Sequence, residues 1–427
     1  YMAGKKERKG PAIAYFCMEY GLDTSLQIYS GGLGILAGDY LKEASDMKVN
    51  MTAVGLLYRY GYFRQSITQQ GEQVSVYEAQ DFSKIPATPV RDSEGNWVLI
   101  SLSLPGRELK ARVWRVDVGR TELYLLDTDF EDNLPEDRQI THHLYGGDWE
   151  NRLKQEMLLG LGGIRLLRTL GIHADLYHCN EGHAAFIGIE RIREYVEQNF
   201  TFSEAIELVK VSSLFTTHTP VPAGHDAFSE DLIRTYMSHF PSLMKIDWAA
   251  FMSLGRSNPA DSNEKFSMSY LACSLSQGVN GVSWLHGKVS RDILSYMWPG
   301  YLPEELHIGY VTNGVHYPTW CSNLWKPIHA KAFGPEFATH NYDKKCFEGI
   351  YNVESKEIWD VRKKLRARLI ERINRRLSNP NVSTHYSPQQ IVKIKNTLRD
   401  DILTIGFARS FATYKRAHLL FRDLDRL

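Results

Sequence analysis

The sequence predicts an α/β protein built on a parallel sheet with helices on both faces. Two observations support this fold class. Short apolar runs of strand length alternate with amphipathic runs of helix length along residues 175–312, and a strand, helix and strand pattern occupies residues 11–57. Such alternation is typical of parallel sheets, in which each helix returns the chain over one face. Because ligands of these sheets bind where the strands end, we expect a site in the loops at their carboxyl ends.

The composition indicates a globular protein without a strong electrostatic preference. Its 427 residues are too many for one small core and fit two or more domains. Hydrophobic residues make up 43% of the chain, and 50 Lys and Arg balance 50 Asp and Glu. A net charge of zero gives no overall attraction to nucleic acid or to an anionic membrane. We therefore expect neither as a partner, and any phosphate binding must be local.

The cysteines and the N-terminus indicate in which cellular compartment the protein is expected. Five cysteines, an odd number without CxxC spacing, argue against a disulfide framework and favour a reducing, cytoplasmic environment. The first ten residues are basic, but the apolar core of a signal peptide does not follow them. The chain begins with Tyr1 rather than Met, which leads us to expect a piece of a longer polypeptide.

In the first part of the chain, an apolar run at 11–17 predicts a buried strand. A glycine-rich loop, a helix to about Met47 and a second strand at 49–57 follow it. Residues 97–127 alternate apolar and polar side chains and are split by two turns, Pro105-Gly106 and Gly119-Arg120, which predicts a β-meander or a pair of hairpins. Residues 151–170 have helical spacing despite three glycines.

The α/β pattern continues through the middle of the chain. Strands are predicted at 175–179, 211–216, 278–282 (or a tight turn) and 308–312, and helices at 182–195, 204–209, 267–275 and 286–297.

Three domains are expected from these patterns. The α/β part occupies 1–323, and 324–398, rich in Lys, Arg and Asn, is expected to be a helical connector. The apolar run 402–407 predicts a buried strand and 413–427 a helix, so that 399–427 would be the first β-α unit of a further domain. One such unit cannot bury its apolar face, and we therefore expect that domain to be incomplete.

The glycine-rich loop is the most distinctive local feature. Gly31, Gly32 and Gly34 surround Leu33 directly before a predicted helix. Glycine lets a ligand approach the main chain, and a helix N-terminus favours an anion such as phosphate. A tight turn without a ligand explains the glycines equally well, because such motifs have many false positives.

Four further loops follow predicted strands and carry amide, hydroxyl or imidazole groups suited to sugar hydroxyls. Taken singly, each is more often an ordinary turn or helix cap. Four at one sheet edge favour a binding site, and they occupy residues 180–183, 217–220, 280–283 and 312–315.

Metal and hydrolase chemistry are less well supported. His183, His218 and His286 lack the local spacing of a metal site, and no metal is expected. Glu181 and Asp148 could form the acid and base of a glycosidase, although such an enzyme has no use for a phosphate-type loop. No G-x-S-x-G motif occurs.

The segment 413–416 (TYKR) follows the apolar run at 402–407. Lys415 and Arg416 could face the glycine loop across a cleft between domains and clamp an anion. The alternative is a solvated helix start, and the glycine loop opposite favours the clamp.

Several of these segments together resemble one family, the α-glucan (glycogen, starch and maltodextrin) phosphorylases, in its shorter bacterial and archaeal branch. They span nearly the whole chain in family order: 15–42, 151–156 (NRLKQE), 177–186 (YHCNEGHAAF), 215–228, 279–291, 309–320 and 406–421.

The resemblance implies a GT-B architecture, with two Rossmann-like domains facing each other over a cleft and the β-meander as an insertion in the first. It implies transfer of a terminal α-1,4-linked glucose to inorganic phosphate, giving glucose 1-phosphate with retained configuration. It also implies pyridoxal phosphate as cofactor, whose phosphate exchanges a proton with the substrate phosphate. The implied partners are an α-1,4-glucan, inorganic phosphate and a second copy in a homodimer.

The resemblance also implies roles for individual residues. Leu33, His218 and Asn313 would contact the reacting glucose, and His218 would also approach its anomeric centre. Gly31, Gly32, Arg409 and Lys415 would bind the substrate phosphate. Glu181 and His183 would lie near the acceptor glucan, Tyr145 on a loop gating the cleft, and Glu19 would be a buried carboxylate supporting the glycine loop.

Two departures from the family pattern matter. The family's cofactor lysine lies well downstream of Lys415 and is absent from this chain, so we expect this polypeptide alone to be inactive and to bind no covalent cofactor. The family usually has two basic residues before F-A-T-Y-K, and here the pair is Arg409-Ser410. Serine cannot replace a bidentate arginine on phosphate, which implies weakened phosphate affinity unless Arg409 compensates.

Two alternatives remain on the sequence alone. A starch or glycogen synthase carries a similar glycine loop, usually with a lysine just before it, where this chain has Tyr29-Ser30. A glucan-binding module without catalysis is the second alternative, and Ser410 leaves it open.

Overall fold

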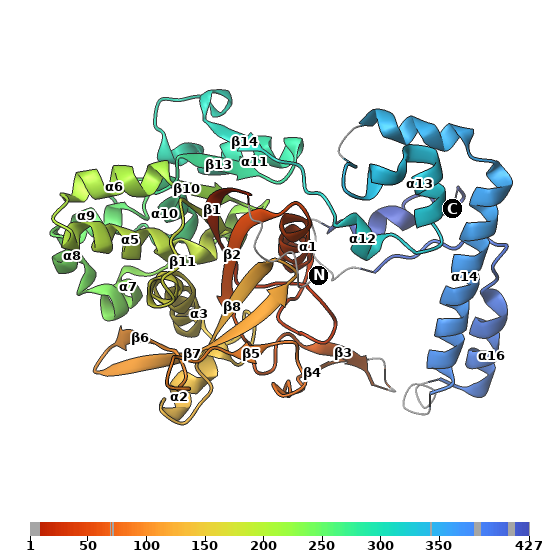
Figure 1. Ribbon diagram of the computed structural model, residues 1–427, viewed down its shortest axis with the longest axis horizontal. Coiled ribbons are helices and arrows are strands. Elements are labelled where there is room, and N and C mark those ends of the chain that lie inside the picture. The colour runs from red at the N-terminus through yellow and green to blue at the C-terminus, as the bar shows by residue number, and fades with distance from the viewer. Residues whose placement is uncertain are drawn as a thin grey trace. The chain divides into compact units, whose positions relative to one another are not determined.

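In a computed structural model of the chain, the described residues are 9–68, 70, 72–341, 344–379, 386–408 and 415–426. They divide into two units, Tyr1–Arg64 with Ser75–Trp320 (unit 1) and Gln65–Val74 with Cys321–Leu427 (unit 2). Unit 1 is built on one large sheet (Figure 1). The α/β class is confirmed.

The sheet centres on β1 (Lys9–Phe16), which pairs in parallel with β2 (Val49–Leu56) on one side and with β9 (Leu176–Asn180) on the other. Among the described residues ten strands join it, in the order β14-β13-β10-β9-β1-β2-β8-β7-β5 with β6 on β7. The strands from β14 to β8 run parallel, which confirms the predicted sheet type. The remaining parallel strands are β8 (Thr121–Asp127), β10 (Ser213–Thr216), β13 (Gly278–Gly281) and β14 (Ile308–Tyr310).

The predicted meander is present and extends the main sheet. β6 (Leu99–Leu104), β7 (Arg107–Val118) and β8 pair antiparallel in turn, while β8 also pairs in parallel with β2. The short β5 (Thr88–Pro89) lies on the other edge of β7. Apolar side chains such as Leu123 and Leu125 are fully buried because this part of the sheet belongs to the same core as β1.

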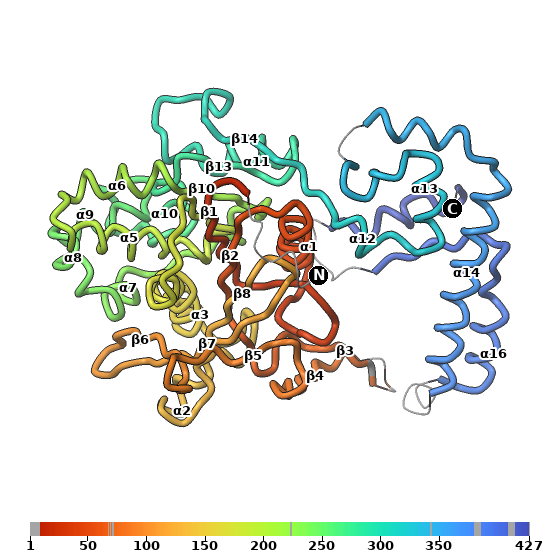
Figure 2. The backbone as a smooth tube through the Cα atoms, in the orientation of Figure 1, coloured from red at the N-terminus to blue at the C-terminus, as the bar shows by residue number. Residues whose placement is uncertain are grey.

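The predicted helices are confirmed, with shifts of a few residues at their ends. Figure 2 follows the chain from β1 through α1 into β2. The helices are α1 (Gly32–Asp46), α3 (Trp149–Met157), α4 (Gly163–Thr169), α5 (Phe186–Glu197), α6 (Phe202–Val211), α10 (Met268–Ser274) and α11 (Trp284–Leu294).

The predicted helix 151–170 is interrupted by a π-helical turn, Leu158–Gly162, between α3 and α4. A Cβ on Gly160 would lie 2.6 Å from Cβ of Phe186 and 2.9 Å from the amide nitrogen of Ile187. Glycine at this position therefore lets the turn lie against the start of α5, and the helix continues in spite of its low helix propensity.

Further elements were not predicted. α7 (Glu230–Met237) and α9 (Trp248–Ser253) begin at Ser229 and Asp247, whose side chains accept hydrogen bonds from backbone N–H groups in the first turn. Such caps are readable in a sequence. Also unpredicted are α2 (Pro135–Arg138), α8 (Phe240–Leu243), α12 (Tyr317–Trp320), the β3–β4 hairpin (Arg64–Ile67, Gln73–Val76) and the β11–β12 pair (Ala227–Phe228, Phe266–Ser267).

The part of unit 2 that begins at Cys321 contains helices and no strand among its described residues. Its helices are α13 (Lys326–Phe333), α14 (Ser355–Leu377) and α16 (Pro388–Thr397), with a 3₁₀ segment at Lys344–Asn352. Ile328, Val353 and Val361 form its small apolar core. No helix in the described ranges is long and apolar enough to cross a membrane.

Two predictions for the last part of the chain are wrong. Residues 402–407 form no strand, and Leu403 and Ile405 are 76% and 66% exposed. A strand needs a hydrogen-bonded neighbour, and no strand pairing in the described residues involves this run. The described part of the predicted helix 413–427 contains only a 3₁₀ turn, Ala417–Phe421.

Candidate active site

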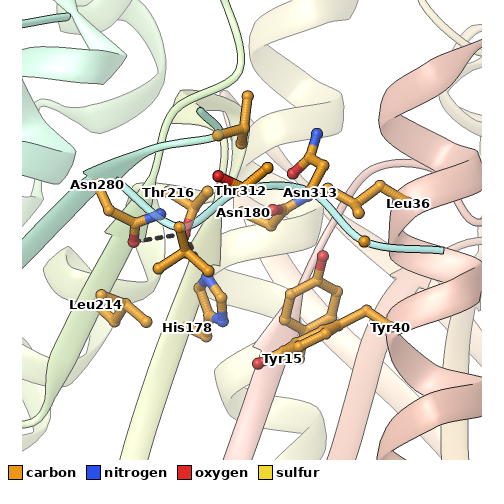
Figure 3. A pocket seen from close by; sticks show the side chains of 13 residues that line it. Tyr15, Leu36, Tyr40, His178, Asn180, Leu214, Thr216, Asn280, Thr312 and Asn313 are labelled. Carbon is orange, nitrogen blue, oxygen red and sulfur yellow. Dashed lines mark hydrogen bonds between the residues drawn. The ribbon is translucent and has the colours of Figure 1, made fainter. Parts of the chain in front are cut away.

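A pocket of about 270 Å³ lies where β9, β10, β13 and β14 end (Figure 3). Asn180, Thr216 and Asn280 are neighbours in register across three of these strands. Together with Asn313, which follows β14, they form the polar wall of the pocket. Three of the four predicted loops (180–183, 280–283 and 312–315) line this pocket. The fourth (217–220) meets them at the same sheet edge, where Thr217 N–H donates to the Asn280 carbonyl at 3.0 Å, as expected for a parallel sheet.

Beneath the pocket, a chain of hydrogen bonds joins the strands. His178 Nε2 lies 2.8 Å from Thr216 Oγ1, and that hydroxyl donates to Asn280 Oδ1 at 3.0 Å. The threonine proton is used on Asn280, so His178 must donate from Nε2. Burial, together with the nearby His218, lowers the pKa of His178 from 6.5 to about 3, which keeps the imidazole neutral.

The glycine loop caps α1. Gly31 is the N-cap, and its carbonyl accepts the first helical hydrogen bond from Ile35 N–H. Gly31 and Gly32 are exposed, and a Cβ on either would meet no atom within 4 Å. Leu33 is partly buried against the core. The main chain at Gly31 and Gly32 is therefore open to a ligand, at the end of a helix where the dipole favours an anion.

Glu19 lies directly under this loop. It is 3% exposed, and its Oε2 accepts a 2.8 Å hydrogen bond from Ser30 N–H. A Cβ on Gly34 would lie 2.7 Å from the same oxygen, so the loop and the carboxylate are in contact. The other oxygen, Oε1, accepts a 2.6 Å hydrogen bond from the hydroxyl of Tyr145. One buried carboxylate thus holds the glycine loop and the Tyr145 loop together.

Glu181 organises the loop after β10. Its φ is 74°, a conformation that non-glycine residues rarely adopt. Its Oε2 accepts hydrogen bonds from His218 N–H at 2.8 Å and from Thr219 Oγ1 at 3.0 Å. The carboxylate therefore fixes the main chain at His218.

The His218 side chain lies against Asn180. His218 Nε2 is 2.8 Å from Asn180 Oδ1, while Asn180 Nδ2 donates to Cys17 Sγ. Burial lowers the pKa of His218 even though the Glu181 carboxylate opposes this. A neutral His218 that donates from Nε2 keeps Nδ1 as an acceptor for a hydroxyl.

The side chain of His183, which was expected to lie near the acceptor glucan, is buried and bound to the main chain. His183 is 1% exposed, and its Nε2 accepts a 3.0 Å hydrogen bond from Met18 N–H. Burial lowers its pKa well below 6.5, so it is a neutral core histidine. It supports the segment 17–19 from beneath.

Residues 17–19 join the two parts of the site, a connection that the sequence analysis missed. Cys17 accepts from Asn180, which also contacts His218, and Met18 donates to His183. Glu19 holds the glycine loop. Cys17, Met18 and Glu19, which follow β1, thus contact both the segment after β9 and the glycine loop before α1.

A second missed residue is Arg152 on α3, although its motif NRLKQE was noted. Its guanidinium forms ion pairs with Asp226 at 2.6 Å and with Glu156 at 3.0 Å, and it lies 4.6 Å from the centre of the Tyr145 ring. Glu156 is 0% exposed, and burial raises its pKa well above the usual value. Arg152 is therefore the cation that compensates these carboxylates beside Tyr145.

Three other expected residues differ in how they lie in the chain. Lys415 belongs to unit 2 and the glycine loop to unit 1, and Arg409 and Ser410 fall outside the described residues. Asp148 is the N-cap of α3 and accepts from Asn151 N–H, which gives it a structural task in place of the glycosidase role considered above. The described residues contain no group of three His, Cys, Asp or Glu side chains that could hold a metal.

Pyridoxal phosphate enzymes hold the cofactor through a lysine Schiff base. The residues lining the pocket at the strand ends include no lysine. This pocket therefore offers no attachment point for a Schiff base.

Comparison with known proteins gives one consistent result. The family model for carbohydrate phosphorylases matches residues 170–397. A maltodextrin phosphorylase of Thermococcus litoralis is 40% identical over 415 residues, which cover 97% of this chain and 48% of that protein. Glycogen phosphorylases of Mycobacterium tuberculosis H37Rv and Aquifex aeolicus are 40% and 36% identical, over 97% of this chain and 49% and 59% of their own lengths. The chain spans about half the length of the first two of these curated relatives.

Proposed function

The chain belongs to the carbohydrate phosphorylase family, and we propose that the protein carrying it transfers terminal α-1,4-linked glucose from a glucan to inorganic phosphate, releasing glucose 1-phosphate. The observation that carries this proposal is the open glycine loop held by Glu19. Two of the relatives, each 40% identical to this chain, are named for maltodextrin and glycogen, which supports a glucan as the substrate.

Phosphate would bind at the glycine loop. The exposed main chain at Gly31 and Gly32 supports this, because amides at a helix N-terminus stabilise an anion. Glu19 would keep the loop in shape from below, since both its oxygens are already occupied by hydrogen-bond donors. In the proposal, Lys415 and Arg409 complete the phosphate site.

The reacting glucose would lie between the loop and the strand ends. Asn313 offers an exposed amide at the pocket, and His218 offers a neutral imidazole nitrogen as acceptor. Leu33 would supply apolar contact with the sugar ring. Sugar hydroxyls need donors and acceptors together, and this set provides both.

Glu181 is assigned to positioning in this proposal, because its carboxylate is used on the His218 and Thr219 donors. Tyr145 would act on the loop at the entrance to the site. Pyridoxal phosphate is included on the strength of the family alone, and when bound it supplies a phosphate group for acid–base chemistry.

The test is phosphorolysis by the protein that carries this chain. Maltoheptaose with inorganic phosphate should give glucose 1-phosphate, measured by coupling to NADPH formation, and omission of phosphate should abolish the signal. If glucose is instead transferred to the glucan from a nucleotide sugar, or if glucan is bound without turnover, the proposal fails.

A further inference from the structure

The segment 311–315, which carries Asn313, is exposed along its whole length. Two main-chain hydrogen bonds hold it on the side of β13. Val311 N–H donates to the Gly281 carbonyl at 3.0 Å, and Asn313 N–H donates to the Val282 carbonyl at 3.1 Å. Because an exposed segment opens easily, Asn313 keeps one position only if the far end of the segment is held as well.

The far end is held by Asp39 on α1. This carboxylate is 3% exposed, and its Oδ2 accepts two hydrogen bonds, from His316 N–H at 3.1 Å and from Trp320 Nε1–H at 2.6 Å. His316 directly precedes the short helix α12, and Trp320 ends it. One carboxylate oxygen thus fastens both ends of α12 to α1.

Two further residues of α1 hold the same turn. Lys42 Nζ donates to Thr319 Oγ1 at 3.4 Å, and that hydroxyl lies 2.7 Å from His316 Nδ1. His316 Nε2 lies 3.1 Å from Asp46 Oδ2. Asp39, Lys42 and Asp46 are three and four residues apart and therefore share one face of the helix. This face of α1 holds α12 through side chains along two turns of the helix.

Another face of α1 is fixed to the support of the glycine loop. A Cβ on Gly38 would overlap the carbonyl oxygen of Gly21, so the helix packs directly on the main chain there. Gly21 N–H in turn donates to the Gly34 carbonyl at 2.6 Å. Since α1 begins in the glycine loop, the helix is a rigid link between that loop and α12.

The pocket at the strand ends is built from the two elements that Asp39 joins. Leu36 and Tyr40 of α1 line it, and so do Thr312 and Asn313 (Figure 3). Asp39 itself does not line the pocket. Its contact with α12 therefore acts on the shape of the pocket without touching what the pocket holds.

We propose that Asp39 is a positioning residue, which through His316 and Trp320 sets where Asn313 lies relative to the glycine loop. The inference rests on the proposed function, in which Asn313 contacts the reacting glucose and the glycine loop contacts the phosphate. These two reactants must meet at bonding distance, and a displacement of about 1 Å can cost about a hundredfold in rate.

The first experiment measures the attachment itself, by hydrogen exchange with mass spectrometry on the protein that carries this chain. Asp39→Ala removes the acceptor, and the amides of residues 311–316 should exchange at least about tenfold faster than in the unmodified protein. Trp320→Phe removes one of the two donors from a side chain that is 55% exposed, and it should give a smaller change in the same direction. Unchanged exchange in both folded variants overturns the inference.

The second experiment measures phosphorolysis. Asp39→Ala should lower kcat by about a hundredfold and change the KM for phosphate by less than about threefold, because the glycine loop keeps its contact with Glu19. Asp39→Asn keeps an oxygen that can accept both hydrogen bonds, and it should retain kcat within about threefold.

A double variant separates positioning from a general loss of stability. If Asp39 acts through Asn313, then adding Asp39→Ala to Asn313→Ala should lower kcat by no more than about a further threefold. Thermal melts establish that each variant is folded at the assay temperature.

Asp92→Ala is the matched control. Asp92 also accepts two hydrogen bonds on one carboxylate oxygen, from Glu94 N–H and Asn96 N–H, both at 2.9 Å, in a turn before β6. Its removal should leave both kcat and the exchange of residues 311–316 unchanged.

The outcomes separate this role from the proposed function. Faster exchange in Asp39→Ala supports the role of Asp39 even if the unmodified protein shows no phosphorolysis, in which case only the proposed function fails. In an active protein, an unchanged kcat for Asp39→Ala overturns the inference. So does an equal loss from Asp39→Ala in the presence and in the absence of the Asn313 side chain.

Discussion

The hydroxyl of Tyr145 donates a 2.6 Å hydrogen bond to Oε1 of Glu19, and this contact ties the Tyr145 loop to the glycine loop. Tyr145 has a φ of 57°, a left-handed conformation that costs a non-glycine residue about 1 kcal/mol or more. The Arg152 guanidinium lies against its ring. The hydrogen bond and this cation–π contact offset the backbone cost and hold the residue in place.

Removing the hydroxyl tests this relationship. Tyr145→Phe should raise the KM for phosphate by about tenfold and lower the melting temperature by a few degrees, because a hydrogen bond to a carboxylate contributes about 1.5–3 kcal/mol. The measurement is steady-state phosphorolysis at varied phosphate. Tyr236→Phe, which removes a tyrosine–carboxylate contact to Glu150 elsewhere, is the matched control and should leave this KM unchanged. Equal effects of both variants would show that the Glu19 contact has no special role.

The glycines of the loop should differ in their tolerance of a side chain. Gly34→Ala places a Cβ 2.6 Å from Tyr29 Cβ and 2.7 Å from Glu19 Oε2, so it should lower the free energy of unfolding by about 1–3 kcal/mol. A Cβ added by Gly32→Ala would meet no atom within 4 Å, so this variant should change the free energy of unfolding by less than about 1 kcal/mol. Urea denaturation of both variants measures the difference. If Gly34→Ala were as stable as Gly32→Ala, the close contact with Glu19 would be contradicted.

The buried His178 should make stability depend on pH. Its pKa is lowered from 6.5 to about 3, so between these values the unfolded chain binds a proton that the folded chain does not. The contribution of His178 to the free energy of unfolding is therefore fully present above about pH 6.5 and is lost as the pH decreases below that value. His178 alone should account for a loss of about 2 kcal/mol between pH 7 and pH 5.

His178→Gln keeps a donor to Thr216 and removes the titration. The unfolding free energy of this variant should fall less between pH 7 and pH 5 than that of the unmodified protein, as measured by urea denaturation at the two pH values. If the unfolding free energies of the variant and of the unmodified protein differ by the same amount at pH 7 and at pH 5, His178 is not held neutral by its surroundings.

Arg152 should be essential to stability because it compensates two carboxylates. Arg152→Met leaves Asp226 and the fully buried Glu156 without their cation, which should cost about 3–5 kcal/mol. Adding Glu156→Gln should recover part of that loss. Arg234→Met, at an exposed ion pair with Glu230, is the control and should cost less than about 1 kcal/mol in chemical denaturation. If Arg152→Met also lowered the free energy of unfolding by less than about 1 kcal/mol, Arg152 would not be the cation that compensates Asp226 and Glu156.

Much of the fold could be predicted because its signals are local. The apolar runs that became β2 and β13 are bounded by turn residues, and the alternation at 97–127 marked the meander. The meeting of Asn180, Asn280 and Asn313 at one pocket followed from a general property of parallel sheets, since their strands all end on the same edge.

The errors arose where a local pattern depends on distant contacts. The run at 402–407 has strand composition, but a strand forms only with a partner. The burial of the His183 ring beneath Met18 also depends on tertiary contacts, which its polar sequence motif does not reveal. The ion pairs of Arg152 with Asp226 join residues 74 positions apart, a pairing that no spacing in the sequence reveals.

The central claim is most directly tested by ³¹P NMR of the protein that carries this chain, mixed with maltoheptaose and inorganic phosphate. We expect the phosphate signal to decrease while a glucose 1-phosphate signal of the α-anomer grows in proportion. An unchanged phosphate signal while the glucan remains bound, or release of free glucose in its place, would contradict phosphorolysis at this site.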